Sequence, residues 1–221
     1  MNHLLSRAEK KMGKYAVKNL MLYIVGTMLL VYVTDILLYA SNAGFSLSEA
    51  LMFNRQAVFS GEVWRLITFV FIPPDTSIFF ILLSLYFSYM IGSSLEAQWG
   101  AFKFNVYYLL GMLCTVIAGM ITGYATGSYI HLTLFFAFAV IYPDYKVMLF
   151  FVIPVKVKYL AMVSGALCVA SLILSPLYDK IALIAAMGNF LLFFTGDMIR
   201  NVRAYIRRKK YKKEMNDYWK H

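Results

Sequence analysis

Charged residues are scarce in this chain of 221 residues, of which only 14% are Asp, Glu, Lys or Arg. A typical soluble domain carries about 25% charged and about 45–50% apolar residues. Here the hydrophobic share reaches 61%, which excludes a water-soluble globular domain and indicates a membrane protein. At roughly 20 residues per transmembrane helix, the length allows six or seven spans with short loops and leaves no room for a separate soluble catalytic domain.

Acidic residues and cysteines are also few. Asp and Glu number 11 against 21 Lys and Arg, which gives a formal net charge of +10. The two cysteines, Cys114 and Cys168, both lie inside apolar runs, which is neither a disulfide framework nor the spacing of metal ligands. The sequence contains no His/Glu cluster at helical spacing and no glycine-rich phosphate loop. We therefore expect no metal site and no bound cofactor.

Six apolar segments predict six transmembrane helices. They run over about residues 20–40, 76–95, 104–123, 129–143, 159–177 and 181–194. The fourth segment would make only about 21 Å of helix, against ~30 Å for the hydrocarbon core of a bilayer, so we expect it to stop short of one membrane face. Residues 147–154 are shorter still and are bracketed by Lys146 and Lys156. They are predicted to form an interfacial or re-entrant segment.

The distribution of basic residues predicts the orientation in the membrane. With the N-terminus inside, only Arg55, Arg65 and Lys180 fall outside, and the other 18 basic residues are cytoplasmic. By the positive-inside rule, the chain divides into a basic cytoplasmic N-tail (1–19), a six-helix membrane domain (20–199) and a basic cytoplasmic C-tail (200–221). The run RRKKYKK in the C-tail is typical of a segment that contacts anionic lipid headgroups rather than nucleic acid.

The long connection between the first two spans, roughly residues 41–75, is too apolar for a solvated linker. We expect it to lie in the membrane interface, where the ring of Trp64 would sit at headgroup level. Asp35 lies inside the first span, where an unpaired carboxylate is costly. It is therefore predicted to form a structural hydrogen bond with a loop residue such as Arg65.

Short motifs in this loop and at the end of the second span have a recognisable order. The loop carries Trp64 and Arg65, and the second span ends with Gly92, Glu96 and Gly100. In this order and spacing, over roughly residues 60–198, the chain resembles the rhomboid superfamily. The resemblance implies an all-α multi-pass membrane protein, a six-helix rhomboid-like bundle with a short fourth helix and a long interfacial first loop. In such a bundle glycine permits close helix packing, and Glu96 could cap backbone groups at the helix end.

The catalytic residues of rhomboid proteases are only partly present. Those enzymes use a serine at the top of the fourth helix, a histidine on the sixth helix as general base and a polar side chain on the second helix. Register places Ser128 at the serine, without the flanking glycines of the motif, Ser84 at the polar side chain, and Ala186 at the base. A serine without a base is a poor nucleophile. His131, three residues after Ser128, is a weak candidate to replace the missing base.

The resemblance therefore points to the non-proteolytic, derlin-like pseudoprotease branch. It implies a catalytically inactive protein that binds transmembrane segments of client membrane proteins and influences their folding, transport or degradation. Two alternatives remain open: a rhomboid-type intramembrane serine protease with a Ser128/His131 site, and a small membrane transporter, against which stands the lack of a second inverted repeat. The bare six-span size favours a bacterial plasma membrane over the endoplasmic reticulum.

Overall fold

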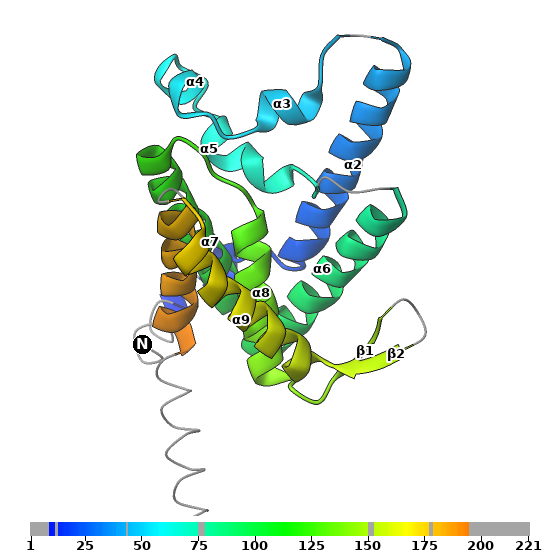
Figure 1. Ribbon diagram of the computed structural model, residues 1–221, viewed down its shortest axis with the longest axis vertical. Coiled ribbons are helices and arrows are strands. Elements are labelled where there is room, and N and C mark those ends of the chain that lie inside the picture. The colour runs from blue at the N-terminus through cyan, green and yellow to red at the C-terminus, as the bar shows by residue number, and fades with distance from the viewer. Residues whose placement is uncertain are drawn as a thin grey trace, which may run out of the picture.

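A computed structural model of the chain describes residues 9–11, 13–42, 44–74, 78–149, 153–176 and 179–194. Helices dominate these residues (Figure 1). The long helices are α2 (Leu20–Ala40), α6 (Ile78–Trp99), α7 (Ala101–Thr122) and α9 (Val157–Leu174), with the shorter α8 (Ser128–Ile141) among them. Residues 179–194 are also helical, and the 3-10 turn η1 (Gly13–Tyr15) precedes α2. Helix α8 contacts α6, α7 and α9, and α2 packs on α6.

The segments that sequence predicts to span the membrane coincide with these helices to within a few residues. Within the described ranges, four helices are long and apolar enough to cross a bilayer: α6, α7, α9 and α2 together with the turn before it. The chain is thus an integral multi-pass membrane protein. Helix α8 has only 14 residues, and the helical residues 179–194 end where the described chain ends, so the count of six spans stays a prediction. Gly100, with φ of +84°, is the single residue between α6 and α7.

The prediction of an all-α fold is wrong for the segment after α8. Strands β1 (Lys146–Leu149) and β2 (Ile153–Lys156) form an antiparallel hairpin there, and the interfacial or re-entrant position of this segment stays a prediction. A helix is disfavoured there because Pro154 cannot continue one. Pairing the two strands gives their backbone groups partners, and the hairpin projects from the side of the helix bundle (Figure 1).

The first loop folds into short helices across one end of the bundle (Figure 1). They are α3 (Leu47–Leu51), α4 (Arg55–Phe59), α5 (Arg65–Thr68) and the 3-10 turn η2 (Phe69–Phe71). Phe53 and Phe69 of this loop are only 2% and 1% exposed, and their rings meet edge to face at 6.2 Å. A Cβ atom added at Gly119 of α7 would lie 2.9 Å from the Phe53 ring. The loop is therefore docked on the helices by its aromatic side chains.

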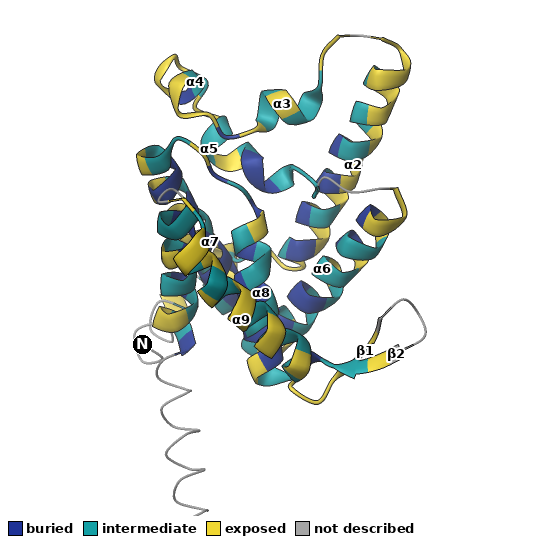
Figure 2. Ribbon diagram, in the orientation of Figure 1, coloured by how far each residue is buried: buried dark blue, intermediate teal, exposed yellow. Residues whose placement is uncertain are grey.

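The interior is built around aromatic rings, and the outer helix faces are apolar. Tyr107 is fully buried and packs against Trp99 and Phe193, with ring centroids 5.4 and 5.0 Å apart. Figure 2 shows buried residues on the inward sides of the helices and exposed residues outside. The exposed residues include many Leu, Ile, Val and aromatic side chains on α2, α6, α7 and α9. A continuous apolar surface of this kind requires lipid around it.

Candidate functional site

A cavity of about 460 Å³ lies between α2, α6, the start of α8 and the first loop. Apolar side chains such as Met28, Phe69 and Leu85 form much of its wall. Hydroxyl groups and one imidazole share the same wall, contributed by Ser84, Ser88, Thr126, Ser128 and His131. A smaller hollow of about 160 Å³ lies between α6 and α8 and also touches Ser84, Ser88 and His131. The polar groups of two membrane helices thus face a common space.

The short length of α8 creates this cavity. Helix α7 has 22 residues and α8 has 14, which correspond to about 33 and 21 Å. The chain runs down from the end of α7 to the start of α8 as irregular backbone (Figure 1), and Ala125 and Gly127 in this stretch are buried. Non-helical backbone at membrane depth is tolerated where it is buried in protein or lines a cavity. Because this irregular stretch borders the cavity, the side chains of Thr126 and Ser128 form part of the cavity wall.

Ser128 and His131 lie one turn apart on α8 and line the same cavity, but they are not joined. The Ser128 hydroxyl pairs with the Thr126 hydroxyl at 3.1 Å, and the Ser128 N–H donates to Thr126 Oγ1 at 3.3 Å. No hydrogen bond between Ser128 and His131 occurs in the described part of the chain. A serine nucleophile requires a base within about 2.6–3.2 Å. In this structure the Ser128 hydroxyl is therefore paired with Thr126 and not with the imidazole.

Helical residues 179–194 carry a methyl group at the position predicted for the general base. Ala186 is buried there, and its side chain cannot accept a proton. Asn189, nearly one turn later, donates from its amide to the Tyr107 carbonyl at 3.3 Å. A Cβ atom at Gly111 would lie 3.0 Å from that amide nitrogen. Asn189 therefore serves the packing of this helix on α7, and neither Ala186 nor Asn189 supplies a base.

Arg65 holds the first loop together. Its Nε donates to the Glu62 carboxylate at 2.6 Å, and its Nη1 donates to the carbonyls of Glu49 and Met52 at 2.8 and 2.7 Å. These carbonyls lie at the end of α3, where a helix leaves backbone acceptors unpaired. Trp64, beside it, is half exposed. Arg65 therefore shapes the loop, and neither Trp64 nor Arg65 lines the cavity.

The Gly92 and Glu96 positions join α6 to the start of α2. Gly92 is buried, and a Cβ atom there would lie 2.3 Å from Met21 Cγ. The Glu96 carboxylate accepts hydrogen bonds from the N–H groups of Asn19 at 2.6 Å and Leu20 at 3.2 Å. A carboxylate at a helix N-terminus satisfies unpaired donors and interacts favourably with the helix dipole. Glu96 is therefore the cap of α2, supplied by another helix.

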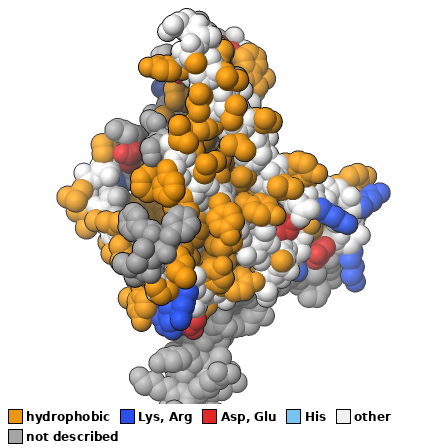
Figure 3. Space-filling view, turned by 90° about the vertical axis from the view of Figure 1, so that its right-hand side faces the viewer, with side chains coloured by type: hydrophobic (Ala, Val, Ile, Leu, Met, Phe, Trp, Pro, Cys, Tyr) orange, Lys and Arg blue, Asp and Glu red, His pale blue; other side chains and the backbone are white. Residues whose placement is uncertain are grey.

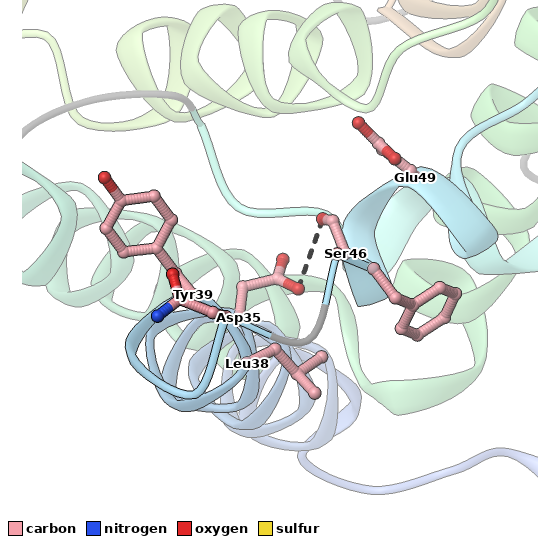
Figure 4. A pocket seen from close by; sticks show the side chains of 8 residues that line it. Asp35, Leu38, Tyr39, Ser46 and Glu49 are labelled. Carbon is pink, nitrogen blue, oxygen red and sulfur yellow. Dashed lines mark hydrogen bonds between the residues drawn. The ribbon is translucent and has the colours of Figure 1, made fainter.

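Asp35 is hydrogen-bonded to the loop, but the predicted partner, Arg65, is wrong. Its carboxylate accepts from the N–H groups of Leu47 and Ser48 at 2.6 and 3.1 Å, and also from the hydroxyls of Ser46 and Ser48. Figure 4 shows the carboxylate turned toward Ser46, beside a hollow of about 520 Å³. The start of α3 offers free N–H donors, whereas the Arg65 guanidinium is occupied by other acceptors.

Register in the sequence identifies Ser84 and Ser128, and the spacing from Ser128 identifies His131, but neither identifies Ser88 and Thr126 as lining the same cavity. Ser88 could be found because it lies four residues after Ser84, on the same face of α6. The place of Thr126 depends on the descending segment before α8, which has no signal in the sequence. Among the described residues, no group of three or more His, Cys, Asp or Glu side chains could hold a metal ion.

Residues 21–214 match the model of the Der1-like family, a range that begins at the second residue of α2 and contains every later helix and strand described above. A comparison with curated proteins gave no match.

Proposed function

This chain belongs to the Der1-like family, within the rhomboid-like superfamily, and from that premise we propose that it is a non-proteolytic member. It binds transmembrane segments of client membrane proteins and influences their folding, transport or degradation. The observation that carries this proposal is that, on the described cavity wall, the Ser128 hydroxyl pairs with Thr126 and not with the His131 imidazole. The buried methyl group of Ala186 lies at the position where register predicts the family's general base.

The physical basis is the cost of polar groups in hydrocarbon. A client segment with a polar side chain is poorly accommodated by lipid, because such groups need hydrogen-bond partners there. Ser84, Ser88 and His131 offer such partners on the facing surfaces of α6 and α8. Helix α8 is also shorter than the bilayer core, and a short hydrophobic helix favours local thinning of the membrane. Both features lower the cost of holding a partly polar helix.

The proposal includes six spans with cytoplasmic N- and C-termini, as the distribution of basic residues predicts. The C-tail, residues 200–221, lies outside the described residues, so its contact with anionic lipid headgroups stays a prediction. The location in a bacterial plasma membrane rather than the endoplasmic reticulum also stays a prediction. Neither a cofactor nor a nucleic acid forms part of the proposed function.

A photocrosslinking amino acid at Met52, which lines the cavity and is not one of its polar groups, is expected to capture a client segment that carries a central Asn more often than an all-Leu segment. The expected ratio is about threefold, because an interhelical hydrogen bond in a membrane contributes on average ~0.6 kcal/mol. The measurement is the yield of crosslinked product in reconstituted vesicles. The control places the same amino acid at Leu109, which is exposed on α7. Equal yields for both segments at Met52 would count against client binding in this cavity.

A protease with a Ser128/His131 site is the second candidate, favoured by the presence of both side chains on one cavity wall. We expect a fluorophosphonate probe to leave the wild type unlabelled, because the serine hydroxyl pairs with Thr126 instead of a base. In-gel detection of the probe, with Ser128→Ala as the control, tests this. If the wild type were labelled and Ser128→Ala were not, the result would support the protease and count against a non-proteolytic protein.

A further inference from the structure

A groove of about 530 Å³, different from the cavity described above, lies between α6 and the β1–β2 hairpin. Its wall on α6 consists of Phe79, Leu82, Leu83, Tyr86, Phe87 and Met90. These residues recur three and four positions apart, so they form one face of the helix. Tyr145, Lys146 and Met148 belong to the opposite wall. The Tyr145 hydroxyl lies 3.4 Å from the Met90 sulfur, which holds the base of the hairpin against α6.

The groove has the length and the surroundings of a lipid acyl chain. From Phe79 to Met90 the helix rises about 16 Å, which is close to the ~15 Å that one acyl chain spans in a ~30 Å hydrocarbon core. Leu82, Tyr86 and Met148 are 53%, 64% and 60% exposed on this face of the membrane-spanning α6. Figure 3 shows hydrophobic side chains over most of this side of the molecule, with most of the visible basic side chains in its lower half. The groove therefore opens toward lipid.

The base of the hairpin has more positive than negative charge. Lys146 pairs in register with Lys156, and like charges directly opposite each other destabilise a pair of strands. Asp144 accepts from Lys156 at 2.9 Å and from Lys158 at 3.2 Å; these bonds lower the pKa of Asp144 and raise that of Lys156. Within the described ranges, no carboxylate pairs with Lys146. An anion beside Lys146 would offset the repulsion.

We propose that this groove binds an anionic phospholipid, with one acyl chain along α6 and the phosphate beside Lys146. The apolar wall from Phe79 to Met90 takes the chain, and the excess positive charge of the hairpin selects the headgroup. The aliphatic stem of Lys146 can lie along the groove while its ammonium reaches the phosphate. The site is separate from client binding and does not depend on it.

The charge of the site is tested with the full chain in nanodiscs that contain equal amounts of phosphatidylglycerol and phosphatidylcholine. Lipids retained after transfer to detergent are counted by native mass spectrometry. In K146Q, the enrichment of phosphatidylglycerol should fall about fivefold, the equivalent of the ~1 kcal/mol contributed by one Lys near an anionic surface. K103Q removes the same charge from a lysine on α7 that pairs with Glu9 at 3.6 Å, and should retain the enrichment. Unchanged enrichment in K146Q, or an equal fall in both variants, would overturn the proposal.

The shape of the site is tested by filling the groove. In L82W the indole occupies the path of the chain, so the number of retained phosphatidylglycerol molecules should fall. L109W places the same side chain on the exposed face of α7 and should leave the number unchanged. Because Leu82 and Leu109 are both exposed, neither variant disturbs the core. Equal retention in L82W and L109W would overturn the assignment of the chain to this groove.

Discussion

Replacing Gly92 by alanine is expected to lower the free energy of unfolding by about 2–3 kcal/mol, within the usual range for overpacking a core. The added Cβ atom would lie 2.3 Å from Met21 Cγ and 2.7 Å from Met21 Cβ. A change of rotamer moves Cγ but leaves Cβ in place, and Met21 is fully buried. Helices α2 and α6 must therefore separate to admit one methyl group. The measurement is SDS-induced unfolding in mixed micelles.

Gly26→Ala is the matched control for Gly92→Ala. It makes the same chemical change on α2, at a glycine whose added Cβ atom would have no neighbour within 4 Å. Alanine also has the better helix propensity, so this variant should be neutral or slightly more stable. If Gly26→Ala and Gly92→Ala unfolded at the same SDS fraction, close packing of α2 on α6 would not explain the glycine in the second span.

Asp35→Ala is expected to increase tryptic cleavage at Arg55 about 100-fold. The substitution leaves the N–H groups of Leu47 and Ser48 without their acceptor, and hydrogen bonds to a charged group contribute about 1.5–3 kcal/mol each. A loss of ~3 kcal/mol in the closure of the loop corresponds to this factor when cleavage follows the open population. Arg55 is exposed on α4 within the same loop. The rate of appearance of the Arg55 fragment measures the effect.

Two variants control the Asp35 experiment. Asp144→Ala removes a carboxylate that accepts from Lys156 and Lys158 on the exposed base of the hairpin, and should leave cleavage at Arg55 unchanged. Asp35→Asn keeps one oxygen acceptor and should give an intermediate rate. A wild-type rate in Asp35→Ala would mean that other contacts, such as those of Phe53 and Phe69, hold the loop alone.

The predictions for Gly92 and Asp35 concern two parts of the structure that both border the cavity. Gly92 sets the distance between α2 and α6, and both helices contribute to the cavity wall. Asp35 anchors the loop, and Met52, Phe69 and Pro73 of that loop also line the cavity. Opening the loop would therefore expose the polar groups on α6 and α8. The stability of the scaffold and access to the proposed client site are coupled through these residues.

The course of the helices follows from the sequence, because the length of an apolar run and the need of the backbone to satisfy its own hydrogen bonds in lipid are local properties. The predicted segment 20–40 coincides with α2, and the short predicted segment 129–143 differs from α8 by one residue at its start and two at its end. The prediction that Ala186 replaces the general base rests on register alone. These features depend on composition and spacing within single segments.

Tertiary structure decided the features that depend on two distant segments. Asp35 accepts hydrogen bonds from the N–H groups at the start of α3, whereas the Arg65 guanidinium donates to the carbonyls at the other end of that helix. Residues 146–149 and 153–156 pair as two antiparallel strands because each strand supplies hydrogen-bond partners for the backbone of the other. Ser88 and Thr126 came to share one wall because α8 begins deeper than α7 ends. A hydrogen bond or a cavity wall of this kind is formed by two segments that are distant in the sequence, so the pattern within one segment does not predict which other segment will supply its partner.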